Sequence, residues 1–268
     1  MPRFPDDLYC TVGCHPTRVG EFEDHPDGPE TYFTALEQLL SQHKFDRSGK
    51  GKGRAVAIGE CGLDYDRLQF SSAELQRKYF ARQLDLAEKI GLPLFLHSRN
   101  AHADLVSILK PRMEALQAAI GSTAVGVVHS FDGTSEEMGE LVDMGLHIGL
   151  NGCSLKTEEN LSVAAKVPLS RLMLETDCPW CEPRPSHASA KHLQAFKTAP
   201  ENAELVKKYF PTQVKKEKWS ESEPTAVKSR NEPCNMGGIA AVVAAVQGRT
   251  LEEVAQQARE NTRTVFGI

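Results

Sequence analysis

The sequence of 268 residues lacks long apolar runs, and this absence excludes two classes of protein. No uninterrupted apolar stretch approaches the ~18 residues that a membrane-spanning helix needs. The N-terminal stretch, Met1 to Asp7, lacks the apolar centre of a secretory signal peptide. We therefore expect a soluble protein of the cytoplasm or the nucleus, with no membrane partner and no indication of an oligomer.

The sequence also lacks a paired cysteine framework and an excess of positive charge. Its seven cysteines are an odd number scattered along the chain, which indicates a reducing compartment. A net charge of −5 provides no general attraction for nucleic acid. A polyanionic substrate must therefore be held locally, by cations in a cleft or by bound metal. With 40% hydrophobic and 25% charged residues, the chain is typical of one large α/β domain.

What the sequence does contain is a set of short apolar runs, each ending in a residue that can bind metal. The run that begins at Ala55 ends at Glu60, and three later runs end at His97, His129 and Asp177. Such runs are typical of buried parallel strands, whose carboxyl ends face the ligand-binding edge of α/β proteins. A single histidine or aspartate at a strand end is more often structural. The four together predict a divalent metal, or a pair bridged by a carboxylate, that activates water.

The rest of the pattern alternates helices with strands and predicts a parallel sheet of six strands in a single domain over 1–268. Two further short strands are expected over 8–13 and 147–151. The expected helices cover 31–42, 72–90, 101–119, 135–144, 158–166, 236–246 and 251–265. Two polar stretches, 48–54 and 178–232, are expected to be loops, the second with a short helix near 203–209.

Five motifs, in this order, resemble those of the TatD-related deoxyribonuclease family and of its eukaryotic TatD domain-containing branch. They are Gly59 to Asp64, His97-Ser98-Arg99, His129-Ser130-Phe131, Glu175 to Pro179 and Asn231-Glu232-Pro233. The resemblance covers nearly the whole chain. It implies a TIM-barrel-like (β/α)8 metal-dependent hydrolase fold and an exonuclease-type enzyme that hydrolyses phosphodiester bonds of DNA.

The resemblance also implies a role for each predicted site residue. Glu60 would bridge two metal ions, and His97 and His129 would be ligands of one of them. Asp177 would be a further ligand that also takes the proton from the attacking water. His15, just after the first expected strand, would face the substrate phosphate. Two divalent ions per site are expected, Mg²⁺ first, with Zn²⁺ or Mn²⁺ as alternatives.

Arg99 has two interpretations that the sequence leaves open. It either holds a substrate phosphate through two parallel hydrogen bonds or forms a structural ion pair with Asp104. The lysines between 207 and 218 similarly either contact phosphate, with Tyr209 and Trp219 as stacking groups, or belong to a solvated loop.

The cysteines also permit more than one interpretation. Cys178 and Cys181 have the spacing of a redox pair or of half a zinc site, but no second such pair accompanies them. The cysteines near strand ends, Cys14, Cys61 and Cys153, are most simply small buried residues.

Two features depart from the family pattern. The chain begins at what resembles the third strand, so about six of eight strands are expected and the first metal subsite, often a His-x-His pair, would be incomplete. Cys234-Asn235 follows the Asn-Glu-Pro motif, where the family commonly has histidine two positions later.

Two alternatives to a deoxyribonuclease therefore stay open. One is a related amidohydrolase-type enzyme for a small cyclic amide or ester, which Glu60 at the bridging position disfavours. The other is an inactive truncated product.

Overall fold

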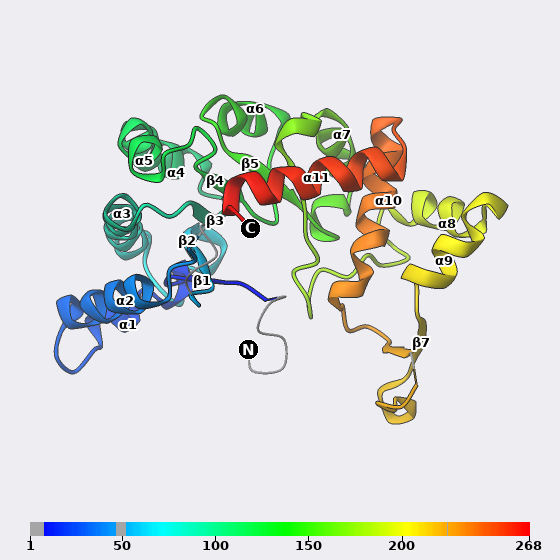
Figure 1. Cartoon of the computed structure of the whole chain (residues 1–268), viewed down its shortest axis with the longest axis horizontal. Coiled ribbons are helices and arrows are strands. Elements are labelled where there is room, and N and C mark those ends of the chain that lie inside the picture. Colours follow the sequence, from blue (N-terminus) through cyan, green and yellow to red (C-terminus); the bar gives the residue numbers. More distant parts are fainter. Residues whose placement is uncertain (1–7, 47–51, 224) are drawn as a thin grey trace. The chain divides into compact units, whose positions relative to one another are not determined.

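A computed structural model describes residues 8–46, 52–223 and 225–268 and shows an α/β fold (Figure 1). Six strands follow one another in the sheet in chain order, and the neighbours β1–β2, β2–β3, β3–β4 and β5–β6 are parallel. The strands are β1 Cys10–Val12, β2 Ala55–Asp64, β3 Leu94–Arg99, β4 Gly126–Val128, β5 His147–Leu150 and β6 Leu172–Leu174. The predicted α/β class and six-stranded parallel sheet are confirmed.

Helices separate the strands, and most lie where the sequence predicts them. They are α1 Gly20–Glu23, α2 Pro29–His43, α3 Ala73–Ile90, α4 His102–Leu109, α5 Met113–Ile120, α6 Ser135–Asp143, α7 Glu158–Lys166, α8 Ala190–Thr198, α9 Ala203–Tyr209, α10 Met236–Gln247 and α11 Leu251–Phe266. The hydroxyl of Ser72 caps α3 by accepting a hydrogen bond from the Leu75 N–H. Gly91 ends the same helix with a left-handed φ of 67°, which glycine adopts without strain.

Two predicted elements end earlier than expected. The helix expected over 101–119 is interrupted, and α4 and α5 are joined by a 3₁₀ turn at Lys110–Arg112 that contains Pro111. Proline has no N–H to donate to the helical ladder, which explains the break. The strand expected to reach Asp177 stops at Leu174. Asp177 has a φ of 50°, which an extended strand does not accommodate.

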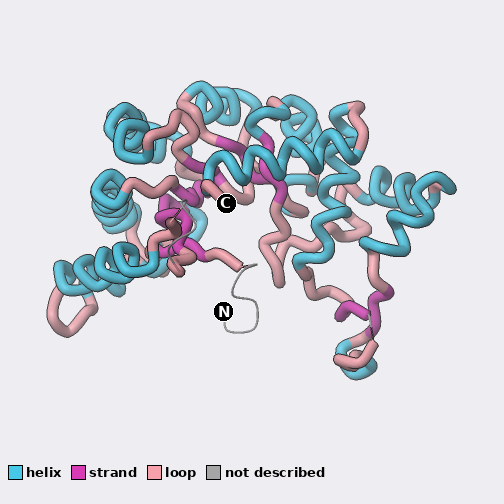
Figure 2. Tube along the Cα trace, viewed as in Figure 1, coloured by secondary structure: helices cyan, strands magenta, loops and turns pink. Residues whose placement is uncertain are grey.

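The prediction of a long loop over 178–232 is wrong for much of that segment. It contains the expected short helix as α9, but also α8 and a parallel pair of strands, β7 Thr212–Val214 and β8 Thr225–Val227 (Figure 2). Large apolar residues are few in this segment of the sequence. Leu193 and Phe210 are the side chains nearest to Gly238 of α10. So few apolar residues among many lysines leave no clear periodicity. The predicted loop at 48–54 lies mostly outside the described residues.

By packing, the chain divides into two compact units. The first comprises 1–129, 139–147 and 262–268, and the second comprises 130–138 and 148–261. The single domain expected over 1–268 stays a prediction. Among the described residues, no helix is both long and apolar enough to cross a bilayer.

In the first unit, α3 packs on β2, and α2, α4 and α5 pack on α3. Beside this layer, the ring of Phe22 stacks on those of Phe33 and Tyr79, with centroids 4.4 Å away in both cases. Cys14, which follows β1, belongs to the same buried cluster. Each large ring buried in this way contributes about 1.5–3 kcal/mol. The segment that carries His15 is thereby fixed against α3.

In the second unit, α10 packs on α7 and α8. This helix is apolar on all sides, and the residues from Gly238 to Ala244 are buried. At its end, the Gln247 side-chain amide donates hydrogen bonds to the carbonyl oxygens of Ala164 and Val167, 2.9 and 3.0 Å away. These bonds fasten α10 to the end of α7.

Candidate metal site

Three predicted metal ligands of the first unit converge on one point. The Oε1 atom of Glu60 lies 2.7 Å from Nδ1 of His97 and 2.7 Å from Nε2 of His129. The two ring nitrogens are 3.4 Å apart. One ligand atom from each of these residues lies within 4.8 Å of the others. The structure thus brings these three side chains together as expected, while their role as ligands stays a prediction.

Two glycines allow the strands beneath this cluster to approach one another. A Cβ on Gly59, whose φ is 147°, would lie 2.3 Å from the Phe95 carbonyl oxygen of β3. A Cβ on Gly13, after β1, would lie 2.8 Å from the backbone of Gly59. Any side chain at either position would force the strands apart. The pairing of β2 with β3 also shifts register between Gly59 and Cys61, on either side of Glu60.

Two buried glutamines of α3 hold the backbone on either side of the cluster. The Gln83 side chain accepts from the Cys14 N–H at 2.7 Å and donates to the Cys14 carbonyl at 3.0 Å. The Gln76 side chain makes the same pair of bonds with the backbone of Asp64, at 2.7 and 2.9 Å. Seven residues, or two turns, separate the glutamines on one helix face. The sequence does contain a signal for these two glutamines, because a polar residue on the apolar face of a predicted helix needs a hydrogen-bond partner. The sequence analysis did not use this signal.

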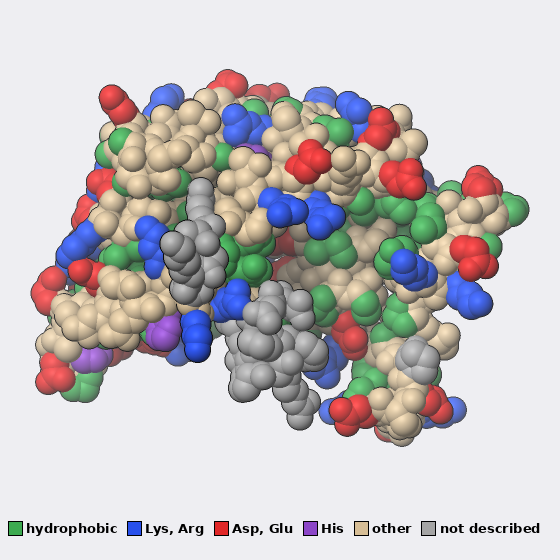
Figure 3. All heavy atoms as spheres, in the orientation of Figure 1, with side chains coloured by type: hydrophobic (Ala, Val, Ile, Leu, Met, Phe, Trp, Pro, Cys, Tyr) green, Lys and Arg blue, Asp and Glu red, His purple; other side chains and the backbone are tan. Residues whose placement is uncertain are grey.

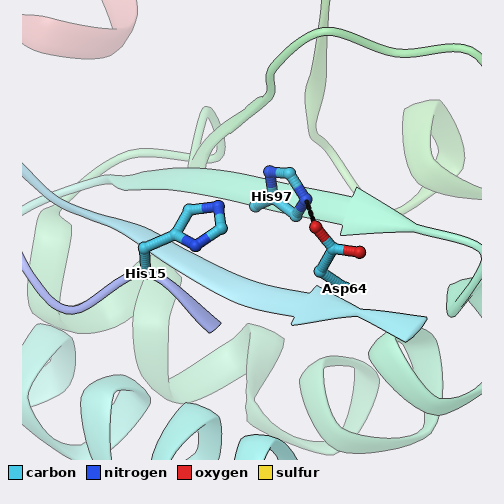
Figure 4. A group of neighbouring side chains, drawn as sticks. All are labelled: His15, Asp64 and His97. Atoms are coloured by element: carbon cyan, nitrogen blue, oxygen red, sulfur yellow. Dashed lines mark hydrogen bonds and ion pairs between the residues drawn. The ribbon is translucent and has the colours of Figure 1, made fainter. Parts of the chain in front are cut away.

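Asp64, at the end of β2, belongs to this cluster, although the sequence analysis did not select it as a site residue. Its Oδ2 atom lies 3.2 Å from Nε2 of His97, and Figure 4 shows these two side chains beside His15. One ligand atom from each of His15, Asp64 and His97 lies within 4.8 Å of the others. Carboxylates that accept the second ring N–H of a metal-binding histidine fix its orientation. Asp64 is suited to this role because it leaves Nδ1 of His97 directed at Glu60.

The charges within the cluster favour an ionised carboxylate at both acidic positions. Burial alone would raise the pKa of Glu60, but hydrogen bonds from His129, His15 and His97 outweigh it and hold that pKa well below its usual range. Burial also opposes ionisation of Asp64, yet its hydrogen bond with His97 and the charges of His97, Arg67 and Arg99 lower its pKa. Burial would lower the pKa of His97, but hydrogen bonds to Asp64 and Glu60 raise it. A group of imidazoles around an anionic carboxylate is a donor set that fits a divalent transition metal.

His15 directs an N–H into the same cluster. Its Nδ1 atom accepts the backbone N–H of Thr17 at 3.2 Å, so a neutral ring carries its proton on Nε2. That Nε2 atom lies 3.4 Å from Oε1 of Glu60. A partly exposed N–H at this place is suited to an anionic oxygen. The predicted contact between His15 and a substrate phosphate is therefore compatible with the geometry and stays a prediction.

Asp177 belongs to the second unit, where it opens a tight turn that ends at Cys181. Both residues have left-handed backbones, with φ values of 50° and 52°. Non-glycine residues in this conformation cost of order 1–3 kcal/mol each and persist where surrounding contacts hold them. Within the turn, the Trp180 N–H donates to the Asp177 carbonyl at 2.9 Å. The participation of Asp177 in the metal site stays a prediction.

Asn231 supplies the contacts that hold this turn. Its side-chain amide donates to the carbonyl oxygens of Thr176 and Trp180, at 2.7 and 2.8 Å, and its backbone N–H donates to Pro179 at 3.2 Å. The Asn231 side chain in turn accepts from the side-chain amide of Asn235 at 2.9 Å. The Asn-Glu-Pro motif therefore acts structurally on the turn. Asn235, where the family commonly has histidine, supports the same residue.

Arg99 ends β3 in the first unit, and its charge helps to lower the pKa of Asp64. Asp104, the partner that the sequence analysis considered for it, is bonded to other groups. Its Oδ2 atom accepts from the Arg77 guanidinium at 3.0 Å and from the Tyr65 hydroxyl at 2.5 Å. The contact of Arg99 with a substrate phosphate stays a prediction.

Histidines and a carboxylate that gather on neighbouring strands of a parallel α/β sheet are typical of the class of metal-dependent hydrolases. The family described as TatD related DNase matches residues 1–267. The chain is 44% identical over 252 residues to the deoxyribonuclease Tat-D of Schizosaccharomyces pombe, covering 94% of this chain and 72% of that protein. It is 33% identical over 267 residues to the 3'-5' ssDNA/RNA exonuclease TatD of Erwinia tasmaniensis, covering 98% and 80%. The chain belongs to the TatD related DNase family, as its motifs predicted.

A solved structure supports the fold of this family. The crystal structure of an uncharacterized amidohydrolase from Saccharomyces cerevisiae superposes with a TM-score of 0.80 at 34% identity, covering 97% of this chain and 80% of that chain. The predicted TIM-barrel-like hydrolase fold is thereby confirmed.

Proposed function

We propose that this protein is a deoxyribonuclease that hydrolyses phosphodiester bonds of DNA with divalent metal ions held by the Glu60 cluster. The observation that carries this proposal is the convergence of Glu60, His97 and His129 in a TatD-related chain. One ligand atom from each lies within 4.8 Å of the others, and the three residues are on, or directly after, the neighbouring strands β2, β3 and β4. The names of the relatives in fission yeast and Erwinia support a nuclease and, for the latter, an exonuclease acting on single strands. We infer the same exonuclease-type action here.

The donor set guides the choice of metal. Bound metal supplies two effects, neutralising charge on the phosphoryl oxygens and lowering the pKa of water. Imidazole nitrogens suit Zn²⁺ and other transition metals, whereas Mg²⁺ prefers oxygen ligands and retains several waters. His97 and His129 therefore favour Zn²⁺ or Mn²⁺ over the Mg²⁺ expected from the resemblance. We propose two ions per site, which Glu60, His97 and His129 would help to hold.

The protein's own residues have distinct tasks in the proposed reaction. His15 donates its Nε2–H to a non-bridging phosphate oxygen and thereby orients the scissile group. Arg99 pairs with the phosphate through its planar guanidinium. Asp177 accepts the proton of the attacking water. Asp64 keeps the ring of His97 in place throughout.

Binding of the polyanionic strand must depend on local contacts. Lysines and arginines number 31 against 36 acidic residues, and both signs are interspersed over the face seen in Figure 3. Because metal neutralises phosphate locally, a protein of net negative charge can still act on DNA. A location in the cytoplasm or nucleus remains part of the proposal.

A nuclease assay with controlled metal content tests the function. The purified 268-residue chain is stripped with chelator, then incubated with an end-labelled single-stranded oligonucleotide and Zn²⁺, Mn²⁺ or Mg²⁺ in turn. We expect shortening of the labelled strand with metal and none with excess chelator. A separate assay with an RNA oligonucleotide tests whether the chain also cleaves RNA. A further assay with a cyclic amide tests the amidohydrolase alternative. Undiminished hydrolysis in excess chelator contradicts the mechanism, and a well-folded chain that binds no metal supports the inactive alternative.

A further inference from the structure

Two cysteines of the second unit, Cys153 and Cys181, lie in direct contact. Their Sγ atoms are 2.9 Å apart, and both residues are reduced thiols of intermediate burial. A disulfide bond is about 2.0 Å long, so the sulfurs need to move by less than 1 Å to be joined. The sequence spacing had offered Cys178 as a redox partner of Cys181 only as one of two interpretations.

The backbones around these thiols are also in contact, so the proximity does not depend on side-chain rotation alone. A Cβ placed on Gly152 would lie 2.0 Å from the carbonyl oxygen of Cys181. The Cys153 N–H donates to the fully buried side chain of Asn151 at 2.9 Å. Cys181 closes the turn that Asn231 holds. Both cysteines are thus fixed by contacts of the backbone within one unit.

The two thiols form a short chain of hydrogen bonds that ends on Asp177. Cys153 donates its S–H to the sulfur of Cys181, and Cys181 donates to Oδ2 of Asp177 at 3.1 Å. The thiol of Cys181 therefore helps to orient the carboxylate that the proposed function assigns to the attacking water. If Cys181 loses its S–H hydrogen, the Asp177 carboxylate loses a hydrogen-bond donor, although Asp177 itself is chemically unchanged.

We propose that Cys153 and Cys181 form a reversible disulfide, with a small-molecule disulfide such as oxidised glutathione as the oxidant. Two S–H bonds and the S–S bond of the oxidant break, and one protein S–S bond forms. The two electrons and two protons pass to the oxidant, which leaves as two thiols. The effect on the enzyme, which rests on the proposed function, is that Asp177 loses its thiol donor.

The exchange is expected to be slow, which decides the design of the test. The hydrogen bond from Cys153, burial and the hydrogen bond with Asp177 all raise the pKa of Cys181. Because the thiolate is the attacking species, the chain is brought to equilibrium in anaerobic glutathione buffers of stepped ratio and then quenched with acid and alkylated. Peptide mass mapping reports the result, so no nuclease activity is needed for this part.

We expect a cross-linked peptide pair containing Cys153 and Cys181, lighter by two hydrogens than the separate peptides. Cys153→Ser and Cys181→Ser each abolish it, whereas Cys234→Ser, a control at an exposed cysteine outside this contact, retains it. A cross-link between Cys178 and Cys181 overturns the proposal. So does alkylation of Cys153 and Cys181 that stays complete at every glutathione ratio. Circular dichroism melting of each variant confirms that a lost cross-link does not result from unfolding.

A second readout separates this inference from the proposed function. In the oxidised wild type we expect kcat on single-stranded DNA to fall about tenfold and to recover with dithiothreitol, since a hydrogen bond to a charged group is lost. The rate of Cys153→Ser should not respond to oxidised glutathione. A mapped disulfide with an unchanged rate overturns the link to Asp177. If the reduced chain cuts no DNA, the proposed function fails, while the mass mapping still decides whether the disulfide forms.

Discussion

Glu60 lies within a strand of ten residues, whereas Asp177 follows a strand of only three and lies in a strained turn. In the first unit, paired strands and two buried glutamines position the carboxylate and its histidines. In the second unit, side-chain hydrogen bonds from Asn231 and a thiol from Cys181 position the aspartate. A site built on sheet is held by many shared backbone bonds, but one built on a turn depends on few contacts. The two carboxylates should therefore respond differently to substitution.

The largest effect should come from removal of the charge of Glu60. Glu60→Gln keeps the size of the side chain but replaces the anionic oxygen on which three imidazoles converge. We expect kcat to fall by at least about 10³-fold and bound metal to be largely lost. Steady-state rates and elemental analysis of the dialysed protein measure both. Glu140→Gln, at a carboxylate bonded to His102 on the surface, is the matched control. Normal metal content in Glu60→Gln would contradict the site.

The next largest effect should come from Asp64, which contacts His97 on the side away from Glu60. Asp64→Asn keeps a polar group near Nε2 but removes the negative charge. Substitutions of such supporting carboxylates typically weaken metal binding by about 10- to 100-fold. Titration with a competing metal indicator measures the change, and Asp66→Asn, at an exposed neighbour, is the control. Unaltered metal affinity in Asp64→Asn would show that the sheet alone orients His97.

The sequence predicted the first unit better than the second, for physical reasons. The strand that carries Glu60 is a continuous apolar run, and such a run is typical of a strand buried in a parallel sheet. Asp64 was missed because the apolar run appeared to end at Glu60, whereas the strand continues through Cys61 and Leu63 to Asp64. The turn of Asp177 depends on Asn231, 54 positions later, and no local pattern reveals such a hydrogen bond. The contact between Cys153 and Cys181 was also missed, because the two residues are 28 positions apart and no local pattern connects them.

A smaller effect on catalysis, but a large one on stability, is expected from Asn231→Ala. The change leaves the carbonyl oxygens of Thr176 and Trp180 without their amide donor, at a cost of about 1–3 kcal/mol for each buried group. Chemical denaturation should show this loss, and kcat should fall about tenfold as the turn relaxes. Metal affinity should fall much less than in Glu60→Gln, because Glu60, His97 and His129 are in the other unit. Asn235→Ala is the graded control. A parallel loss of metal would remove the contrast between the two carboxylates.

The smallest effect concerns Trp180, which the turn of Asp177 presents to solvent. Trp180 is 71% exposed, which is unusual for a large apolar residue. Its backbone N–H donates to the Asp177 carbonyl within the turn, and its carbonyl accepts from the side-chain amide of Asn231. An exposed indole on this held backbone, three residues from Asp177, is suited to stack on a base of the substrate, which typically contributes about 1–3 kcal/mol. Trp180→Ala should raise KM for single-stranded DNA about fivefold, the lower end of that range, with little change in kcat.

Trp219 provides the matched control for this last prediction. It is 46% exposed, and its indole N–H donates to the Thr225 carbonyl at 3.1 Å beside the β7–β8 pair. An oligonucleotide with an abasic spacer at its labelled end removes the base but keeps the phosphates. Measured with metal present, as an inhibition constant against the normal strand, its affinity should be nearly equal for wild type and Trp180→Ala, because no base remains to stack. If Trp219→Ala weakens binding of the normal strand more than Trp180→Ala does, the lysine-rich segment, and not the turn of Asp177, is the surface that holds the bases.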